Sequence, residues 1–380
     1  MKIVAITTVP YEYEYTRPIG DVNLPDGVTR GADLAVFVET DEEVAGTTIG
    51  AFEAAAAIRG LEPLLVGEDP RSVRSLWQRM VSVGFKAGVA GPIRLAVAAI
   101  DCALWDLRAK ANGVPLWKEL GGASSTVPAY ASGLDTPLAD GELVDYYRAM
   151  AAQGVSAGKL KIGRDRDDDL RRLGLMADAL ASGGERPALM VDANEFWTPK
   201  QAVQRIAELE RSYELAWVEE PVRRWDASGL RRVSAAIRAP VATGENLNAV
   251  NEYVPLVAAG AVDVVQFGAR TAGITGALQV AELAYAFDLP VSLMNCPGRF
   301  VAHVAAALPH HTRMEVLAAG RDAVLVGQPP VRDGMIHLGD EPGSGVVFDP
   351  ERLAAHRIET PSGPTLASTY RRAHDAGLVG

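Results

Sequence analysis

Charged side chains follow four apolar segments in the second half of the chain, at spacings that suit a shared site. They are Lys159 and Lys161, then Asp192 and Asn194, then Glu219, and then Glu245. Carboxylate oxygens are the ligands that hard cations prefer, and Mg²⁺ typically keeps open positions for water or substrate. Zinc would recruit His or Cys, and neither stands at these positions. The pattern therefore indicates one Mg²⁺ ion held by Asp192, Glu219 and Glu245.

An ordinary ion pair at the rim of the fold is the alternative for each of these residues taken singly. Alternation along a strand, however, points Lys159 and Lys161 to the same side. Charged groups that gather inside a protein need partners, since burial without one costs several kcal/mol. Three carboxylates and two ammonium groups on successive segments supply those partners, which favours a common site.

The elements that would carry these residues alternate between short apolar strands and longer helical stretches. Eight such strands lie between about residue 123 and residue 345, and each is followed by a helical pattern. This number and length are typical of a (β/α)₈ TIM barrel, an α/β fold in which the strand ends meet at one face. A doubly wound sheet is the competing fold, but no Gly-rich phosphate loop follows an early strand.

The first 122 residues have a different pattern, typical of an α+β domain. An initial strand is followed by a polar loop, Tyr11 to Gly31, and by two strands on either side of an acidic turn. Residues 71–110 are helical in pattern, and Gly113 ends the run. We therefore expect an antiparallel sheet with helices before the barrel.

Composition narrows the classes of function. The chain has 380 residues, a net charge of −11 and a pI near 5.1, with no block of Lys or Arg, which argues against nucleic acid or an anionic membrane as partner. A small anionic substrate stays possible, because a local cluster of metal and lysine can outweigh the net charge. The two cysteines, Cys102 and Cys296, predict no disulfide framework. With neither a signal peptide nor a membrane span in the sequence, we expect a cytoplasmic protein.

The motifs K-x-K, D-x-N, E-E-P and G-E-N, in this order, resemble those of the enolase superfamily, in the mandelate racemase and muconate lactonizing enzyme group. Residues 98–122 (AAIDCALWDLRAKANGVPLWKELGG) are similar to the segment that joins the two domains in that group. The resemblance implies a modified (β/α)₇β barrel with an α+β capping domain. The expected divisions are a cap of residues 1–122, a barrel of residues 123–345, and a C-terminal segment, 346–380, that returns to the cap. A homo-oligomer, from dimer to octamer, is also expected.

The same resemblance implies the roles of the site residues. The three carboxylates would bind the metal, and Lys161 would be the general base that removes the α-proton of a carboxylate substrate. Lys159 would lower the pKa of Lys161 and contact the substrate carboxylate, while Asn194 would complete the surroundings of the cation. Glu315 would bind an enediolate oxygen; a rim ion pair with Arg313 is the alternative.

Two departures from the group bear on the reaction. Members carry a second acid or base on the opposite face of the substrate, either a lysine at the end of strand six or an Asp there paired with a His after strand seven. Here Gly268 and Asn295 fall at those positions. His303 lies further along, where a core or interface role is expected. Cys296 and Arg270 are the nearest substitutes, although a small buried Cys is the commoner case.

The missing partner favours chemistry on a single face, that is syn-elimination in a dehydratase, or a cycloisomerisation. The loops at residues 11–31 and 47–52, with Arg17, Asp21 and Asn23, would suit a hydroxylated acid such as an acid sugar or a hydroxylated amino acid. A racemase or epimerase with another second base is an alternative. A glycosidase using Glu219 and Glu245 is another, but it leaves the lysines without a purpose. A barrel that binds metal without catalysis is the third.

Overall fold

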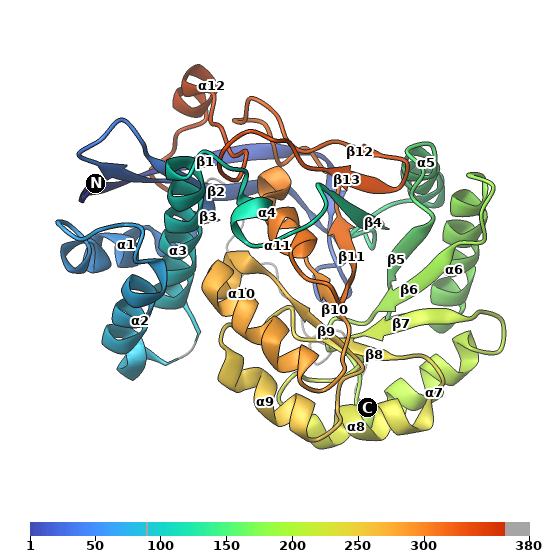
Figure 1. Cartoon of the computed structure of the whole chain (residues 1–380). Coiled ribbons are helices and arrows are strands. Elements are labelled where there is room, and N and C mark those ends of the chain that lie inside the picture. Colours follow the sequence, from blue (N-terminus) through green and yellow to red (C-terminus); the bar gives the residue numbers. More distant parts are fainter. Residues whose placement is uncertain (89, 362–380) are drawn as a thin grey trace.

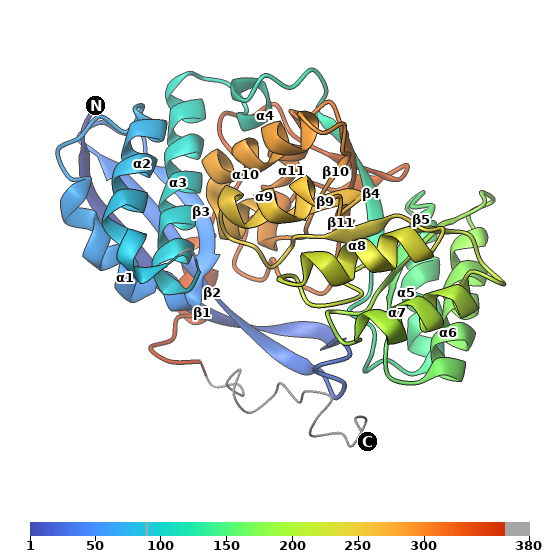
Figure 2. The same ribbon diagram turned by 90° about the horizontal axis from the view of Figure 1, so that it is seen from below.

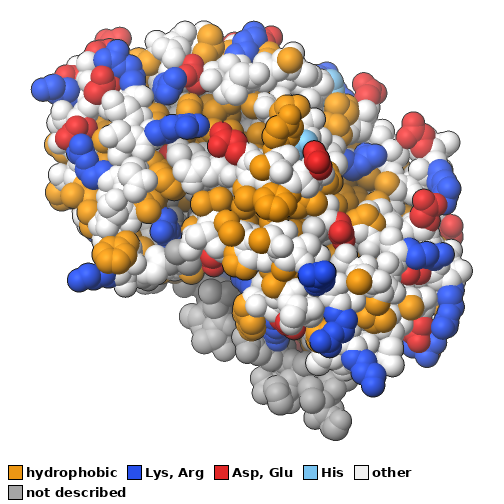
Figure 3. Space-filling view, turned by 60° about the horizontal axis from the view of Figure 1, so that its bottom comes forward, with side chains coloured by type: hydrophobic (Ala, Val, Ile, Leu, Met, Phe, Trp, Pro, Cys, Tyr) orange, Lys and Arg blue, Asp and Glu red, His pale blue; other side chains and the backbone are white. Residues whose placement is uncertain are grey.

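The computed structural model describes residues 1–88 and 90–361, and it divides them into a barrel and a cap that packs against one side of it (Figure 1). Among these residues, no helix combines the length and the apolar character needed to cross a bilayer. Lys, Arg, Asp and Glu side chains are intermixed on the face shown in Figure 3, without a large area of one sign.

The cap contains a three-stranded antiparallel sheet covered by helices. Its strands are β1 (Ile3–Ile19), β2 (Val28–Thr40) and β3 (Gly46–Ala51), in that order across the sheet. Its helices are α1 (Ala55–Leu61), α2 (Val73–Gly84), α3 (Pro92–Ala111) and the short α4 (Leu116–Glu119). Single 3₁₀ turns occupy Phe52–Ala54, Glu62–Leu64 and Phe85–Ala87.

The prediction that residues 11–31 form a loop is wrong for most of this segment. Strand β1 continues through the run YEYEY as far as Ile19, and β2 begins at Val28, so the loop spans only residues 20–27. Tyr11 and Tyr13 are buried whereas Glu14 is exposed, which is the period of two that a strand requires. In the sequence, the glutamates between the tyrosines made this segment resemble a polar loop. Figure 2 shows the resulting β1–β2 ribbon reaching from the cap toward the part of the barrel that carries α6 and α7.

Eight parallel strands form the closed barrel, as the resemblance implied. They are β4 (Thr126–Ser132), β5 (Ala157–Lys161), β6 (Ala188–Asp192), β7 (Leu215–Glu219), β8 (Val241–Thr243), β9 (Val264–Phe267), β10 (Val291–Leu293) and β11 (His311–Val316). Each strand pairs with its neighbour in sequence, and β11 pairs with β4 to close the barrel. The strand positions expected from the sequence are confirmed.

A helix follows each of the first seven strands, which gives the (β/α)₇β order. These helices are α5 (Asp140–Ala151), α6 (Arg166–Ala181), α7 (Pro199–Leu209), α8 (Ala227–Ala236), α9 (Val250–Ala258), α10 (Ala269–Tyr285) and α11 (Ala302–Ala306), with a 3₁₀ turn at Pro297–Arg299. Their apolar faces pack on strands that are buried on both sides, as parallel sheets require.

After β11 the chain returns toward the cap. The hairpin β12 (Val331–Arg332) and β13 (Met335–His337) adds antiparallel to β4. Beyond it, the Phe348 ring lies 6.3 Å from that of Tyr11, and the Glu12 N–H donates to the carbonyl of His356, just past α12 (Pro350–Ala355). Residues 362–380 of the expected C-terminal segment lie outside the described residues, and the domain divisions remain our proposal.

Cap and barrel meet along α3 and α10, which lie side by side in Figures 1 and 2. The fully buried Asp101 of α3 accepts hydrogen bonds from the N–H and hydroxyl of Thr275, and Trp105 donates to the same hydroxyl. Gly273 interrupts α10 at a φ of 73°, where a Cβ would come within 2.7 Å of the Asp101 carboxylate. This contact orients the cap on the helix that follows β9.

The core role expected for His303 agrees with its surroundings. The side chain is 3% exposed, and its Nδ1 accepts the Trp117 N–H at 3.1 Å. Burial lowers the pKa of His303 to about 4. The folded protein therefore holds this imidazole neutral at pH values where the unfolded chain would protonate it.

Because the folded pKa lies below the unfolded value of about 6.5, the contribution of His303 to stability is complete above that pH and is lost as the pH falls toward 4. Replacing it by Asn, which keeps an acceptor but does not titrate, should remove about 2 kcal/mol of the loss in unfolding free energy between about pH 7 and about pH 4.5. Urea unfolding of both proteins at each pH measures this. Equal losses in the two proteins would contradict it.

Candidate active site

Three carboxylates meet at the carboxyl-terminal mouth of the barrel. Asp192 and Glu219 are the last residues of β6 and β7, and Glu245 follows β8 after Gly244. One oxygen from each lies within 4.8 Å of the others. Asp192 and Glu219 are fully buried, so the structure brings together the three residues that the sequence singled out for a metal.

Both lysines of β5 point at this cluster, as alternation along the strand predicts. The Nζ atom of Lys159 lies 2.5 Å from Glu219 Oε1, 3.5 Å from Asp192 Oδ2 and 3.1 Å from Glu315 Oε1. Lys161 donates to Asp192. Since Lys159 is 0% and Lys161 5% exposed, both ammonium charges are compensated by these carboxylates and hardly by water.

Neutral groups fix the orientation of the carboxylates. Glu219 Oε2 accepts from the indole of Trp217 at 3.1 Å and from the amide of Gln266 at 2.6 Å. The Asn194 backbone N–H donates to Asp192 Oδ1 at 2.8 Å. The sequence analysis missed Trp217 and Gln266; their positions, two residues before the end of β7 and one before the end of β9, point them into the barrel.

The residues that follow strands β6, β7 and β8 have unusual backbone conformations. Asn194, Glu195 and Glu220 have φ values of 42°, 61° and 40°, in the left-handed region. Gly244 has a φ of 125°, and a Cβ there would lie 2.4 Å from the carbonyl oxygen of Gln266. Glycine is therefore required in the G-E-N motif so that Glu245 can turn into the site.

The electrostatics of the three carboxylates suit a cation. Burial and the charge of Asp192 raise the pKa of Glu245, and burial raises that of Glu219 despite Lys159. Burial would also raise the pKa of Asp192, but Lys161 and Lys159 outweigh it and lower the pKa. An all-oxygen donor set under mutual repulsion fits a hard divalent ion such as Mg²⁺.

The lowered pKa expected for Lys161 depends on a bound cation, because the contacts within the protein alone act in the opposite direction. Burial and Lys159 both act to lower the pKa of Lys161, but the carboxylate of Asp192 outweighs them and raises it. The prediction considered the effect of Lys159 and of a cation on the pKa of Lys161, but it left out the direct hydrogen bond from Lys161 to Asp192.

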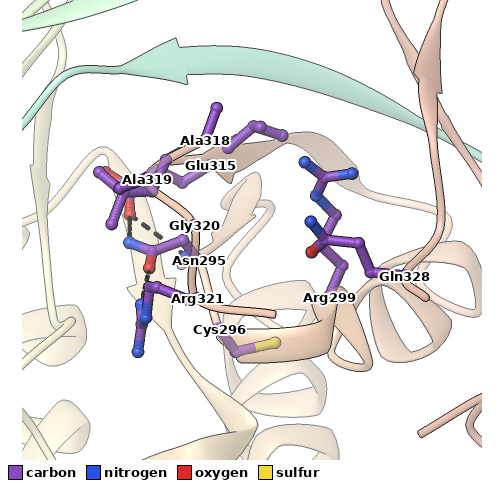
Figure 4. A pocket seen from close by; sticks show the side chains of 11 residues that line it. Asn295, Cys296, Arg299, Glu315, Ala318, Ala319, Gly320, Arg321 and Gln328 are labelled. Carbon is purple, nitrogen blue, oxygen red and sulfur yellow. Dashed lines mark hydrogen bonds between the residues drawn. The ribbon is translucent and has the colours of Figure 1, made fainter. Parts of the chain in front are cut away.

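Glu315 lies between Lys159 and a chain of polar side chains on the side of β10 and β11; Figure 4 shows this chain from Glu315 through Asn295 to Arg321. Its Oε1 faces Lys159, and its Oε2 accepts from the amide of Asn295. The carbonyl of that amide accepts from Arg321 Nη1 at 2.6 Å. The alternative pairing of Glu315 with Arg313 is wrong, because the Glu315 side chain points inward to Lys159. Arg321 was missed, because it lies 26 residues after Asn295 and belongs to no recognisable motif.

Neither substitute suggested for the second acid or base has the required surroundings. Arg270 forms an ion pair with Asp33 of the cap. Burial raises the pKa of the Cys296 thiol to about 11, and its Sγ accepts the Val301 N–H at 3.4 Å. Gly268 caps the N-terminus of α10 directly after β9. Of the positions considered for a second acid or base, Asn295, in the loop after β10, is therefore the one whose polar side chain contacts Glu315.

The tip of the β1–β2 ribbon covers the opposite edge of the site. Asn23 donates from Nδ2 to the carbonyl of Asn194 at 2.9 Å, and Asp21 and Asn23 line a pocket beside Glu245. Arg17 is directed elsewhere, donating to the Leu317 carbonyl and stacking on Tyr146. Of the three cap residues that the sequence suggested for substrate contact, two therefore border the metal cluster.

Comparison with known proteins agrees with this architecture. The model of the enolase C-terminal domain-like family matches residues 142–352, and that of the mandelate racemase / muconate lactonizing enzyme N-terminal domain matches residues 29–121. A 3,6-anhydro-alpha-L-galactonate cycloisomerase from Streptomyces coelicolor is 35% identical over 312 residues, covering 80% of this chain and 83% of its own. An L-talarate/galactarate dehydratase from Salmonella typhimurium is 33% identical over 286 residues, covering 74% of this chain and 70% of its own.

Among solved structures, a racemase from Streptomyces coelicolor with bound magnesium superposes with a TM-score of 0.84 at 30% identity, covering 94% of this chain and all of the other. These similarities confirm the expected fold, enzyme class and magnesium cofactor. They argue against the glycosidase alternative. The chain belongs to the mandelate racemase and muconate lactonizing enzyme group of the enolase superfamily.

Proposed function

We propose that this protein is a Mg²⁺-dependent dehydratase of hydroxylated acids such as acid sugars. Asp192, Glu219 and Glu245 bind the ion, and Lys159 and the ion bind the substrate carboxylate. The observation that carries the choice of reaction is the asymmetry of the site: lysines stand on the β5 side, while the β9 and β10 sides present Gly268 and Asn295.

Dehydration requires a single group that can take and return a proton. When the charge of Asp192 is drawn to a bound Mg²⁺, the pKa of Lys161 would fall and its neutral amine would accept the α-proton, while the C–H electrons form the enediolate. The ammonium then gives this proton to the β-hydroxyl as its C–O bond breaks, which releases water and leaves an enol that tautomerises to a 2-keto acid. A bound Mg²⁺ supplies positive charge that stabilises the enediolate.

Asn295 supports this assignment because an amide cannot act as a base. Its carbonyl is occupied by Arg321 and its NH₂ by Glu315, which holds it in one orientation. Asn194 completes the surroundings of the cation, and Glu315 lies within reach of the same intermediate through its contact with Lys159. A cytoplasmic location and a homo-oligomer, from dimer to octamer, are also part of this proposal.

Replacing Lys161 by Ala should lower kcat for 2-keto acid formation by about 10²–10⁴-fold, the usual contribution of a general acid–base group. Mg²⁺ affinity should be retained, since the three carboxylates remain. A coupled assay with acid sugars measures the rate, and calorimetric titration measures the metal. Lys118→Ala, at a half-exposed position, is the matched control. Unchanged ligand binding in Lys161→Ala, together with no solvent exchange at the α-carbon of any acid bound by the wild-type protein, would instead favour a non-catalytic barrel.

Racemisation or epimerisation is the alternative outcome of the same intermediate, and deuterium oxide separates the two. A dehydratase should form 2-keto acid without inverting the recovered substrate. A racemase should incorporate deuterium at the α-carbon with inversion and form no keto acid. A cycloisomerase should yield a product of unchanged mass. Proton NMR of each reaction decides among these outcomes.

Replacing Glu245 by Gln should weaken Mg²⁺ binding at least about tenfold without weakening the metal-free fold. Burial and Asp192 both raise the pKa of Glu245, so loss of its charge relieves repulsion. Wild-type protein at about 100 times the Mg²⁺ dissociation constant should gain about 2.7 kcal/mol, measurable as a rise in Tm. The control Glu214→Gln changes a side chain that is 79% exposed. The ligand assignment fails if Glu245→Gln keeps wild-type Mg²⁺ affinity.

A further inference from the structure

A second polar pocket lies between the loops that follow β10 and β11, next to the proposed reaction site (Figure 4). The residues of its lining that matter here are Asn295, Cys296, Arg299, Glu315, Arg321 and Gln328. Glu315 is shared by both sites, because its Oε1 contacts Lys159 and its Oε2 contacts Asn295. One side chain therefore separates this pocket from the lysine that faces the substrate carboxylate.

Two guanidinium groups of this pocket have no acidic partner within 4 Å among residues 1–88 and 90–361. Arg321 donates from Nη1 to Asn295 and from Nε to the Tyr13 hydroxyl at 3.4 Å, which leaves its Nη2 unused. Among the described residues, Arg299 donates from Nη1 to the Pro329 carbonyl and from no other nitrogen, and Gln328 makes no hydrogen bond through its amide. Arginine stays protonated in proteins, so two positive charges and several free donors line the pocket, together with the carboxylate of Glu315.

The backbone holds these groups in place at an energetic cost. Arg299 has a φ of 52° and Ala318 one of 44°, both in the left-handed region that costs a non-glycine residue about 1–3 kcal/mol. Gly298 and Gly320, beside them, have φ values of 67° and 76°. Both arginines are partly buried, where a charge without a counterion is unfavourable. Strained backbone that presents partly buried cations is typical of a ligand site.

We propose that this pocket binds a second carboxylate of the substrate, so that the enzyme acts on diacids, the aldaric acids, in preference to aldonic acids with one carboxylate. The inference rests on the proposed function, because it places the first carboxylate at the metal and Lys159. A planar carboxylate fits the paired donors of a guanidinium. A terminal hydroxyl would leave both guanidinium groups without a carboxylate in contact, and such unmade polar contacts give strong discrimination between substrates.

Matched substrates test this directly. Each six-carbon aldaric acid is compared with the aldonic acid of the same configuration, using the Mg²⁺-loaded enzyme and 2-keto acid formation as the readout. For the configuration that is used best, kcat/KM should be about 100-fold higher for the diacid, as expected for loss of charged hydrogen bonds. An aldonic acid used as well as its diacid, or a 6-phosphorylated aldonic acid used better, would overturn the proposal.

Substitution assigns the preference to the pocket. Arg299→Gln should lower kcat/KM for the diacid about 10–100-fold, mainly through KM, and leave the aldonic acid nearly unchanged. Arg332→Gln, at an exposed position on β12 without an ion pair, should change neither. An equal loss for both substrates in Arg299→Gln would mean a structural role and would contradict the proposal.

Binding separates this inference from the proposed reaction. Calorimetry with the Mg²⁺-loaded Lys161→Ala protein measures affinity without turnover. Tighter binding of the diacid that is lost in Lys161→Ala/Arg299→Gln supports the pocket even if no keto acid forms, in which case the dehydratase assignment alone fails. Equal affinity for both acids, or no measurable binding of either, overturns the inference.

Discussion

Compensation of buried charge is the constraint on which the mouth of this barrel depends. Lys159, a cation with 0% exposure, is surrounded by Glu219, Asp192 and Glu315 within 3.5 Å. Removing Lys159 would leave these carboxylates facing one another in a poorly polarisable interior, which is strongly destabilising. The members of the cluster come from different strands. The barrel gives them a common end, and the tight turns after β6, β7 and β8 aim them inward.

Neutral donors determine which carboxylate oxygens are already hydrogen-bonded and which face the centre of the cluster. Trp217 and Gln266 occupy one oxygen of Glu219, and the Asn194 N–H occupies one oxygen of Asp192. Each carboxylate keeps its other oxygen directed at the centre of the cluster. The donors thus orient the carboxylates without adding charge. Arg299 and Arg321, on the side of β10 and β11, differ, since within residues 1–88 and 90–361 no carboxylate lies within 4 Å of either guanidinium.

Much of this site could be predicted because strand period and motif order act locally. An apolar strand that ends in Asp192 or Glu219 places a carboxylate at the mouth of any parallel barrel. Arg321 could not be predicted, because its approach to Asn295 depends on how two long loops fold against each other. The hydrogen bond from Lys161 to Asp192 could not be predicted for a similar reason, since it is one contact across two strands. The length of β1 could not be predicted either, because the glutamates between its buried tyrosines made the second half of the strand resemble a loop.

The return of the chain to β1 has a consequence for the order in which the protein is made. Tyr11 is covered by the ring of Phe348, and the Glu12 N–H is satisfied by the carbonyl of His356. Residues of the first strand thus gain partners that a ribosome adds more than 300 positions later. The barrel strands lie between these two contacting segments in the sequence, so the cap sheet cannot reach its final packing until all of them have been synthesised. Part of a buried tyrosine face then stays exposed throughout synthesis, the condition under which chaperones are needed.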